Sequence, residues 1–368
     1  MRNFVRRYSK LLFVSLVFGG LLALPWVAEE VLGPGTAQAK ITEGDALPQG
    51  AYVPLDPAHP QVRAAMAVQD QYTPSLMAAP DVVGTATGLT AEGQPAILVF
   101  ARRQVIPGSL PAALDGVPVV VQVTGEFVSM KPPAGGTTTV NPKSRFARPV
   151  PIGVSTGNIG ECSAGTIGAR VKDGGNVYAL SNNHVYALEN LAPPGSLVLQ
   201  PGRYDTGCAA DTNDEIGTLA SFVSIVFSTS ASNIVDAAIA LSSTGQLGNA
   251  TPTGGYGTPN STTTPAALNA AVQKYGRTTK LTKGTITGIH ATVNVGYGSS
   301  GTARFVEQII VSAGKPFIKA GDSGSLLVTD PGLNPVGLLF AGTSSGTAIA
   351  NPIAAVLSSF SVTIDGQP

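Results

Sequence analysis

Charged residues are scarce in this 368-residue chain: Asp, Glu, Lys and Arg make up 12% of it, against roughly a quarter in average soluble domains. This scarcity argues against a long helical bundle or a coiled coil. The 22 basic residues equal the 22 acidic residues in number. The chain therefore has neither a basic field for a nucleic-acid backbone nor an acidic excess that would solvate a disordered tail. Function is expected from a local site, with no nucleic-acid partner.

Long apolar runs are also few, and the one that stands out lies near the N-terminus. Four basic residues before position 11 precede the apolar run Leu11–Ala28, and the small-residue sequence Ala37-Gln38-Ala39 follows it. This pattern predicts a signal peptide, residues 1–39, that is cleaved after Ala39. The mature protein is then expected to be secreted or periplasmic, without stable membrane association; a retained membrane anchor is the alternative.

Cysteine and histidine are rare, with two and three residues respectively, and their spacing fits no zinc site. The acidic run Asp211–Glu215 does not continue into an EF-hand pattern. No metal or cofactor is therefore expected. In an exported chain, Cys162 and Cys208 are expected to form one disulfide, which would contribute about 4 kcal/mol in the chain-entropy model. A nucleophilic thiol is the alternative.

Residues 40–130 have a mixed pattern that predicts a small α/β N-terminal domain. Helical spacing runs from Asp56 to Thr73, and Pro74 is expected to end that helix. The expected strands span 82–89, 96–101 and 117–124, with a turn or short helix at 110–114. The domain is either a prodomain that governs folding or activity, or a permanent accessory domain.

The rest of the chain is predicted to be mainly β. Residues 131–156 are rich in Pro, Gly and Thr, which predicts a linker with exposed Arg145 and Arg148 and a place for proteolytic cleavage. Two groups of short β-type runs follow, at 157–245 and 266–368, and each is typical of a β-barrel. The runs of the first group are 164–172, 177–181, 197–200, 216–226 and 234–241; those of the second are 271–275, 283–289, 291–295, 305–311, 325–328 and 335–341.

Three segments carry residues suited to catalysis. His184 follows a β-type run that ends in polar residues. Asp236 is the single carboxylate of an apolar run, where burial without a partner would cost several kcal/mol, so a donor such as an imidazole Nδ1–H is expected beside it. Ser323 stands between Gly321-Asp322 and Gly324, where the glycines let backbone N–H groups point into a shared concavity suited to an oxyanion.

In this order, His184, Asp236 and Ser323 resemble the trypsin-like (chymotrypsin-fold) serine proteases, particularly their bacterial secreted members. The resemblance implies two six-stranded antiparallel β-barrels with an active site between them. It also implies an exported serine endopeptidase that acts on protein or peptide substrates. Ser323 would be the nucleophile, His184 the general base and acid, and Asp236 the group that holds the imidazole. The N–H groups of Gly321 and Ser323 would form the oxyanion hole.

The resemblance further places the base of the primary substrate pocket at Phe317. Its wall would be formed by Phe340, Ala341 and Gly342. No carboxylate stands at Phe317, so the substrate residue is expected to be apolar or small rather than Arg, Lys or Glu. The chain departs from the family pattern in having Val185 where a cysteine usually follows the histidine, and the partner of Asp322 is left open.

Two other functions compete with this interpretation. An α/β-hydrolase esterase is suggested by Gly153-Val154-Ser155-Thr156-Gly157, because Ser155, Asp236 and His290 follow the chain order of that fold. The motif would have to lie between a strand and a helix, and no helical spacing follows it. The second alternative is a non-catalytic binding module on the protease fold, which would normally have lost a residue of the triad.

Overall fold

The computed structural model describes residues 53–130 and 141–368. The predicted signal peptide, residues 1–39, therefore lies outside the described residues, as does the first part of the predicted linker. No helix within the described ranges is both long enough and apolar enough to cross a membrane.

The first barrel is a closed antiparallel sheet of six strands, because β7 and β8 are two parts of one run. β7 pairs with β6, and β8 pairs with β9. The ladder continues in the order β9-β12-β11-β10 and returns to β6. The bounds are β6 Ser155–Asn158, β7 Gly165–Thr166, β8 Ala169–Lys172, β9 Val177–Ser181, β10 Leu197–Leu199, β11 Glu215–Phe222 and β12 Ala238–Ser242. β6 begins inside the range predicted as linker and ends two residues beyond it.

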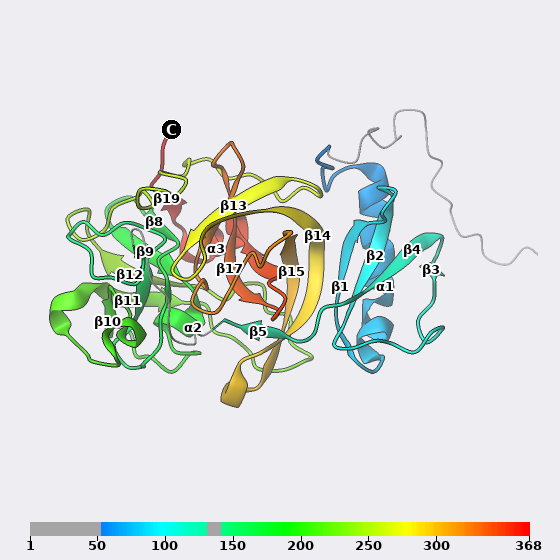
Figure 1. Ribbon diagram of the computed structural model, residues 1–368, viewed down its shortest axis with the longest axis horizontal. Helices are drawn as coiled ribbons and strands as arrows, with labels where there is room; N and C mark the ends of the chain where they lie inside the picture. The colour runs from blue at the N-terminus through cyan, green and yellow to red at the C-terminus, as the bar shows by residue number, and fades with distance from the viewer. Residues whose placement is uncertain (1–52, 131–140) are drawn as a thin grey trace, which may run out of the picture. The chain divides into compact units, whose positions relative to one another are not determined.

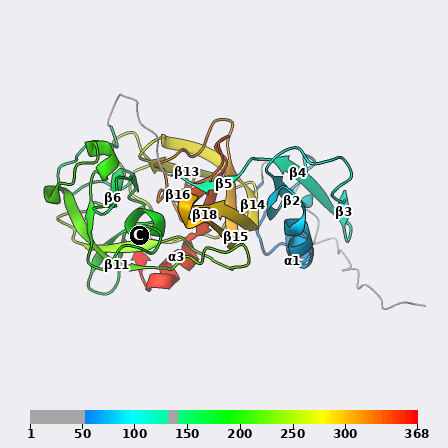
Figure 2. The ribbon, with the colours of Figure 1, turned by 90° about the horizontal axis from the view of Figure 1, so that it is seen from below.

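The second barrel also closes on itself, in the order β13-β16-β17-β18-β15-β14, with β14 pairing back onto β13. Two separate predicted strands, 283–289 and 291–295, form the single strand β14. His290 adopts a positive φ of 54° where the register shifts between Gly288 and Ala291, so the expected break is a bulge. The bounds are β13 Ala271–Gly276, β14 Lys280–Gly296, β15 Thr302–Ser312, β16 Leu326–Thr329, β17 Pro335–Gly342 and β18 Ala348–Pro352. Figure 2 shows β13, β14, β15, β16 and β18 grouped together.

The N-terminal residues form a helix, α1, on a sheet (Figure 1). The helix spans Pro60–Ala78 and contains Pro74, so the prediction that Pro74 ends it is wrong. Its last turn buries Leu76 in a cluster with apolar strand residues, and this burial offsets the lost backbone hydrogen bond. The strands are β1 Val82–Leu89, β2 Pro95–Ala101, β3 Ala113–Leu114 and β4 Val117–Val123. β3 replaces the turn or short helix that was expected there.

Several pairings connect segments that are distant in the sequence. β1 pairs antiparallel with β14, which makes the N-terminal strands part of the sheet of the second barrel. β5 (Phe127–Ser129) pairs with both β14 and β17. At the other end of the chain, α3 (Ile353–Phe360) follows β18, and β19 (Thr363–Ile364) pairs with β8 of the first barrel.

Residues 141–151 lie against the first barrel instead of forming a free connection. Arg145 is exposed, as expected, and also makes an ion pair with Asp214. Arg148 donates to the Gln246 side chain at 2.9 Å, and Val150 is fully buried. The part of the predicted linker that the structure describes therefore packs against the first barrel and buries an apolar side chain there. The predicted fold class, mainly β with two six-stranded barrels after a small α/β region, is confirmed.

Candidate active site

The structure brings His184 and Asp236 together. His184 lies in the short helix α2 (Asn183–Tyr186) just after β9, and Asp236 lies just before β12. Because β9 and β12 pair, with Ser181 opposite Ala238, the two side chains meet at the same end of that pair. The His184 Nδ1 atom is 2.6 Å from Asp236 Oδ2, and the His184 N–H donates to Oδ1 at 3.2 Å. Both side chains are almost completely buried.

The carboxylate of Asp236 has a second partner residue that the sequence did not indicate. The hydroxyl of Tyr297 donates to Asp236 Oδ2 at 2.8 Å, and Tyr297 is 3% exposed. Its burial, together with the nearby Asp236 charge, raises the pKa of Tyr297 well above its ordinary value, so the phenol keeps the proton that it donates. Tyr297 stands in a Gly- and Ser-rich turn, outside any motif that could have singled it out.

Ser323 lies in a buried turn before β16, and its hydroxyl is close to two carbonyl oxygens. The Ser323 Oγ atom is 3.2 Å from the oxygen of Phe340 and 3.3 Å from that of Met130. Gly321, with a φ of 95° that favours glycine, donates its N–H to the same Met130 oxygen at 2.8 Å. The N–H of Gly321, one of the two expected oxyanion-hole donors, thus already donates a hydrogen bond to a carbonyl oxygen. Within the described residues, the buried Nε2 atom of His184 has no hydrogen-bond partner.

The partner of Asp322, left open by the sequence, is Lys274. Both side chains are fully buried, with Lys274 Nζ 3.6 Å from Asp322 Oδ2. Asp322 also accepts hydrogen bonds from the backbone of Thr278, Thr279 and Lys319. Burial lowers the pKa of Lys274, and the Asp322 charge opposes that effect. These contacts anchor the turn that presents Gly321 and Ser323.

The four expected pocket residues have different environments. Phe317 is fully buried in the core cluster that also holds Ile318 and the side chain of Met130. The side chains of Phe340 and Ala341 belong to another core cluster, where the Phe340 and Phe305 ring centroids are 4.7 Å apart. Only the backbone of those two residues is therefore available to border the pocket. At Gly342, a Cβ atom would lie 3.0 Å from Met130 Cε and 2.7 Å from Ile318 Cγ2.

A cavity of about 890 Å³ lies beside β5. Residues 160, 161, 188, 189 and 191 on the side of the first barrel line it, together with residues 296–302 of the second barrel and residues 126, 128 and 129. The two barrels therefore border a shared cleft, and β5 contributes one of its walls.

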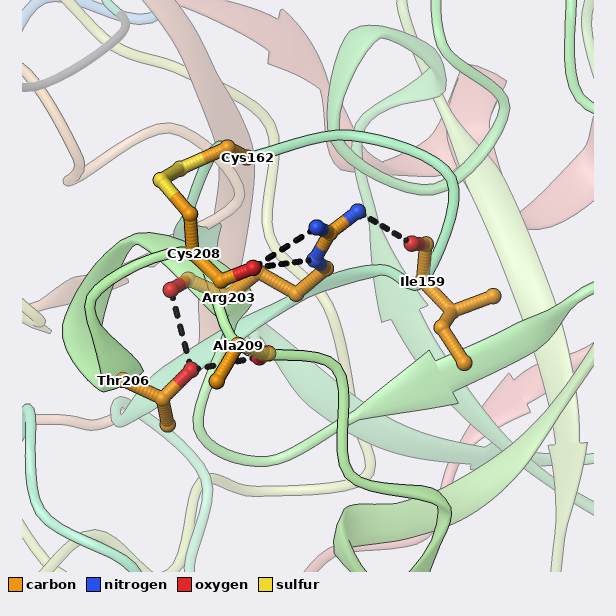
Figure 3. Close-up of a disulfide and its surroundings, with 6 residues drawn as sticks. All are labelled: Ile159, Cys162, Arg203, Thr206, Cys208 and Ala209. Carbon is orange, nitrogen blue, oxygen red and sulfur yellow. Dashed lines mark hydrogen bonds between the residues drawn. A yellow bond between two sulfur atoms is a disulfide. The ribbon is translucent and has the colours of Figure 1, made fainter.

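The predicted disulfide between Cys162 and Cys208 is present, and the two residues are 46 positions apart. Figure 3 shows how Arg203 supports it: the guanidinium donates to the carbonyl oxygen of Cys208 at 2.7 Å and to that of Ile159 at 2.9 Å. The disulfide leaves no free thiol among the described residues, so a nucleophilic cysteine is not available there. Within the same residues, no group of three or more His, Cys, Asp or Glu side chains could hold a metal ion.

The residues of the rival esterase arrangement do not meet. Ser155 begins the strand β6 and donates to Asp205 at 2.5 Å. His290 binds the carboxylates of Asp70 and Glu307, each at 2.7 Å. Neither residue contacts Asp236, and Ser155 is not followed by a helix, so the geometry that this reaction needs is missing.

No protein-family model matches the chain. Over 103 residues it is 37% identical to streptogrisin-A of Streptomyces griseus, a stretch that covers 27% of this chain and 32% of that protein. The chain thus matches about a third of the length of that curated relative.

Solved structures of bacterial proteases are similar to more than half of the chain. A glutamic acid-specific serine protease, whose histidine triad binds substrate, is 23% identical with a TM-score of 0.41 and covers 58% of this chain and 100% of its own. Protease A of Thermobifida fusca is 20% identical with a TM-score of 0.42 and covers 59% and 100%. A Nocardiopsis protease is 19% identical with a TM-score of 0.42 and covers 58% and 99%. With its two closed barrels and its shared segment with streptogrisin-A, the chain resembles the bacterial trypsin-like serine proteases.

Proposed function

We propose that this chain is an exported serine endopeptidase in which Ser323, His184 and Asp236 form the catalytic triad. The observation that carries the proposal is the buried contact of 2.6 Å between His184 and Asp236. The turn of Ser323 adds a Gly321 N–H that already binds a carbonyl oxygen. A non-catalytic binding module would need neither a buried charge nor a free imidazole nitrogen. The disulfide agrees with export, since such bonds persist outside the reducing cytosol.

In the proposed reaction, Ser323 Oγ attacks the carbonyl carbon of a peptide bond and passes its proton to His184 Nε2. Asp236 accepts the Nδ1–H hydrogen bond, which fixes the tautomer and stabilises the imidazolium. The Gly321 and Ser323 N–H groups stabilise the oxyanion, and one such donor is typically worth a factor of about 10² to 10³ in kcat. His184 then protonates the leaving amine, and water releases the acyl group from Ser323.

We further propose that residues 40–130 act as a prodomain. Its strand β1 pairs with β14 of the second barrel, and β5 lies along β17, next to the proposed nucleophile. A purely accessory role does not account for this contact between β5 and the proposed substrate pocket. The barrels depend on contacts between residues that are distant in the sequence, and such contacts form slowly. A prodomain that supports barrel formation would therefore help this chain to fold.

The first prediction is that Ser323→Ala lowers peptide hydrolysis by about 10³-fold or more while the protein stays folded. The matched control is Ser155→Ala, which removes the rival nucleophile and should leave activity within a small factor of wild type. Turnover of a peptide library measures the loss, and a fluorophosphonate probe followed by peptide mapping identifies the reactive serine. Undiminished hydrolysis by the Ser323 variant, or labelling of Ser155 instead, would refute the assignment.

A further inference from the structure

The segment that ends at Met130 lies in the proposed active site in the manner of a bound substrate. β5 runs antiparallel to β17, with Ser129 opposite Ala341 and Val128 opposite Gly342. Extended peptides commonly bind by adding a strand in this way, since main-chain hydrogen bonds give affinity and pockets for side chains give specificity. The following residue, Met130, brings its carbonyl group to the proposed nucleophile.

The carbonyl of Met130 is held at the position where reaction would occur. Its oxygen accepts the Gly321 N–H at 2.8 Å, within the range of about 2.7–3.1 Å that suits an oxyanion donor. The Ser323 Oγ atom is 3.3 Å from that same oxygen. The His184 Nε2 atom has no hydrogen-bond partner among the described residues, and the proposed function assigns it the serine proton.

The side chain of Met130 fills the predicted pocket. It is 7% exposed and belongs to the apolar cluster of Phe317 and Ile318. The Cε atom of Met130 lies so close to Gly342 that a Cβ there would approach it to 3.0 Å. Glycine at this position therefore makes room for the end of a long, unbranched apolar side chain.

We propose that the peptide bond on the carboxyl side of Met130 is the self-processing site of this chain, and that the pocket selects Met-like, unbranched apolar residues. This inference rests on the proposed function. Ser323 Oγ bonds to the Met130 carbonyl carbon while its proton moves to His184 Nε2. The bond to the next nitrogen breaks, and that nitrogen takes the proton and becomes a new N-terminus. Water then hydrolyses the Ser323 ester, which leaves a carboxylate on Met130.

The experiment incubates the purified full chain and follows intact mass and N-terminal sequence. Wild type is expected to yield an N-terminus at position 131, at a rate constant independent of protein concentration, whereas Ser323→Ala stays intact. Met130→Asp should slow cleavage at this bond by about 10²-fold or more, because the pocket is apolar. The matched control Ile106→Asp, at a position 77% exposed, should cleave like wild type. Met130→Leu should retain part of the rate.

The outcomes separate this inference from the proposed function. If fluorophosphonate labels Ser323 but the first cut falls elsewhere, or Met130→Asp cleaves as fast as wild type, self-processing at Met130 is wrong and the protease assignment stands. A rate constant proportional to protein concentration would overturn the intramolecular step. If Ser323→Ala cleaves after Met130 at the wild-type rate, the proposed nucleophile is itself wrong.

A different observation carries a second inference, which also rests on the proposed function. Asp236 Oδ2 accepts from both His184 Nδ1 at 2.6 Å and the Tyr297 hydroxyl at 2.8 Å. The Tyr297 ring lies edge-on to the His184 ring, with centroids 6.0 Å apart, and packs against Phe227 on another side. We infer that Tyr297 is a positioning residue that fixes the Asp236 carboxylate for the triad.

Tyr297→Phe tests this inference, because it removes the hydroxyl and keeps the ring. A hydrogen bond to a charged group is worth about 1.5–3 kcal/mol, so kcat should fall roughly tenfold or more with KM nearly unchanged. The acid limb of kcat/KM against pH should also move to higher pH, because the less neutralised carboxylate favours the imidazolium. The control Tyr256→Phe removes a phenol hydroxyl outside this hydrogen-bond network.

Active sites are titrated with a fluorophosphonate, so that misfolded protein does not count as lost kcat. An unchanged kcat and an unmoved acid limb in Tyr297→Phe would overturn the positioning role. So would a loss confined to the number of active sites, because that result indicates a purely structural tyrosine. If wild type itself fails to react at Ser323, the proposed function fails first.

Discussion

Lys274 and Asp322 show how a single buried pair can control the turn that carries the proposed nucleophile. Both side chains are fully buried, and removing one member of such a pair typically costs about 3–5 kcal/mol. Lys274→Met is therefore expected to lower the free energy of unfolding by about that amount and to reduce the number of titratable active sites. Denaturant unfolding and fluorophosphonate titration measure the two effects.

The double variant Lys274→Met with Asp322→Asn is the control for this pair. It removes both charges, so it should recover part of the stability that the single variant loses. The free energy of unfolding that the double variant loses is compared with the sum of the losses in the two single variants. If the double variant loses as much as that sum or more, the ion pair is not the cause of the loss.

At the scale of elements, the loop closed by Cys162 and Cys208 carries the short helix of His184 and much of the first barrel. The chain-entropy model gives about 4 kcal/mol for a loop of this length, and the separation is 46 residues. The variant with both cysteines changed to serine is expected to lose about that much stability, measured by urea unfolding. The same unfolding midpoint for both proteins would contradict this expectation.

The sequence predicted those elements whose signals are local. Apolar spacing and glycine motifs depend on neighbouring residues. They could therefore identify the strand Val82–Leu89 and the order of His184, Asp236 and Ser323. The continuation of α1 past Pro74 could not, since it depends on burying Leu76 against strands later in the chain. Tyr297 was missed for a similar reason, because its contact with Asp236 spans 61 residues.

At the scale of the whole molecule, His290 links α1 to the second barrel by binding both Asp70 and Glu307. The hydrogen bond with Glu307 and the nearby carboxylates raise the pKa of His290 to about 9, above its unfolded value of about 6.5. The stability from this raised pKa is fully present below pH 6.5 and is lost as the pH rises through about 9.

We therefore expect His290→Asn to be less stable than wild type at pH 6, with a difference that shrinks by pH 9.5. Urea unfolding at pH 6, 8 and 9.5 measures that difference. A difference that stays constant across this range would show that the ion pairs with Asp70 and Glu307 are not its source.

The prodomain proposal predicts that residues 141–368 expressed alone fold poorly. Without β1, the part of β14 that pairs with it would be an unpaired strand edge, and unpaired edges favour aggregation. Adding residues 40–130 as a separate chain should raise the yield of protein that reacts with a fluorophosphonate. If residues 141–368 fold and hydrolyse peptides at the full rate alone, the N-terminal residues are an accessory domain.

The pairing of β19 with β8 connects the last described residues to the first barrel. Thr363 and Ile364 join a sheet whose other strands lie between residues 155 and 242, and Asp365 holds Arg170 and Lys172 in ion pairs. β19 is not one of the six strands that close this barrel, so it adds to the edge of β8 from outside the ladder. The end of the chain is thereby joined to the barrel that carries His184 and Asp236.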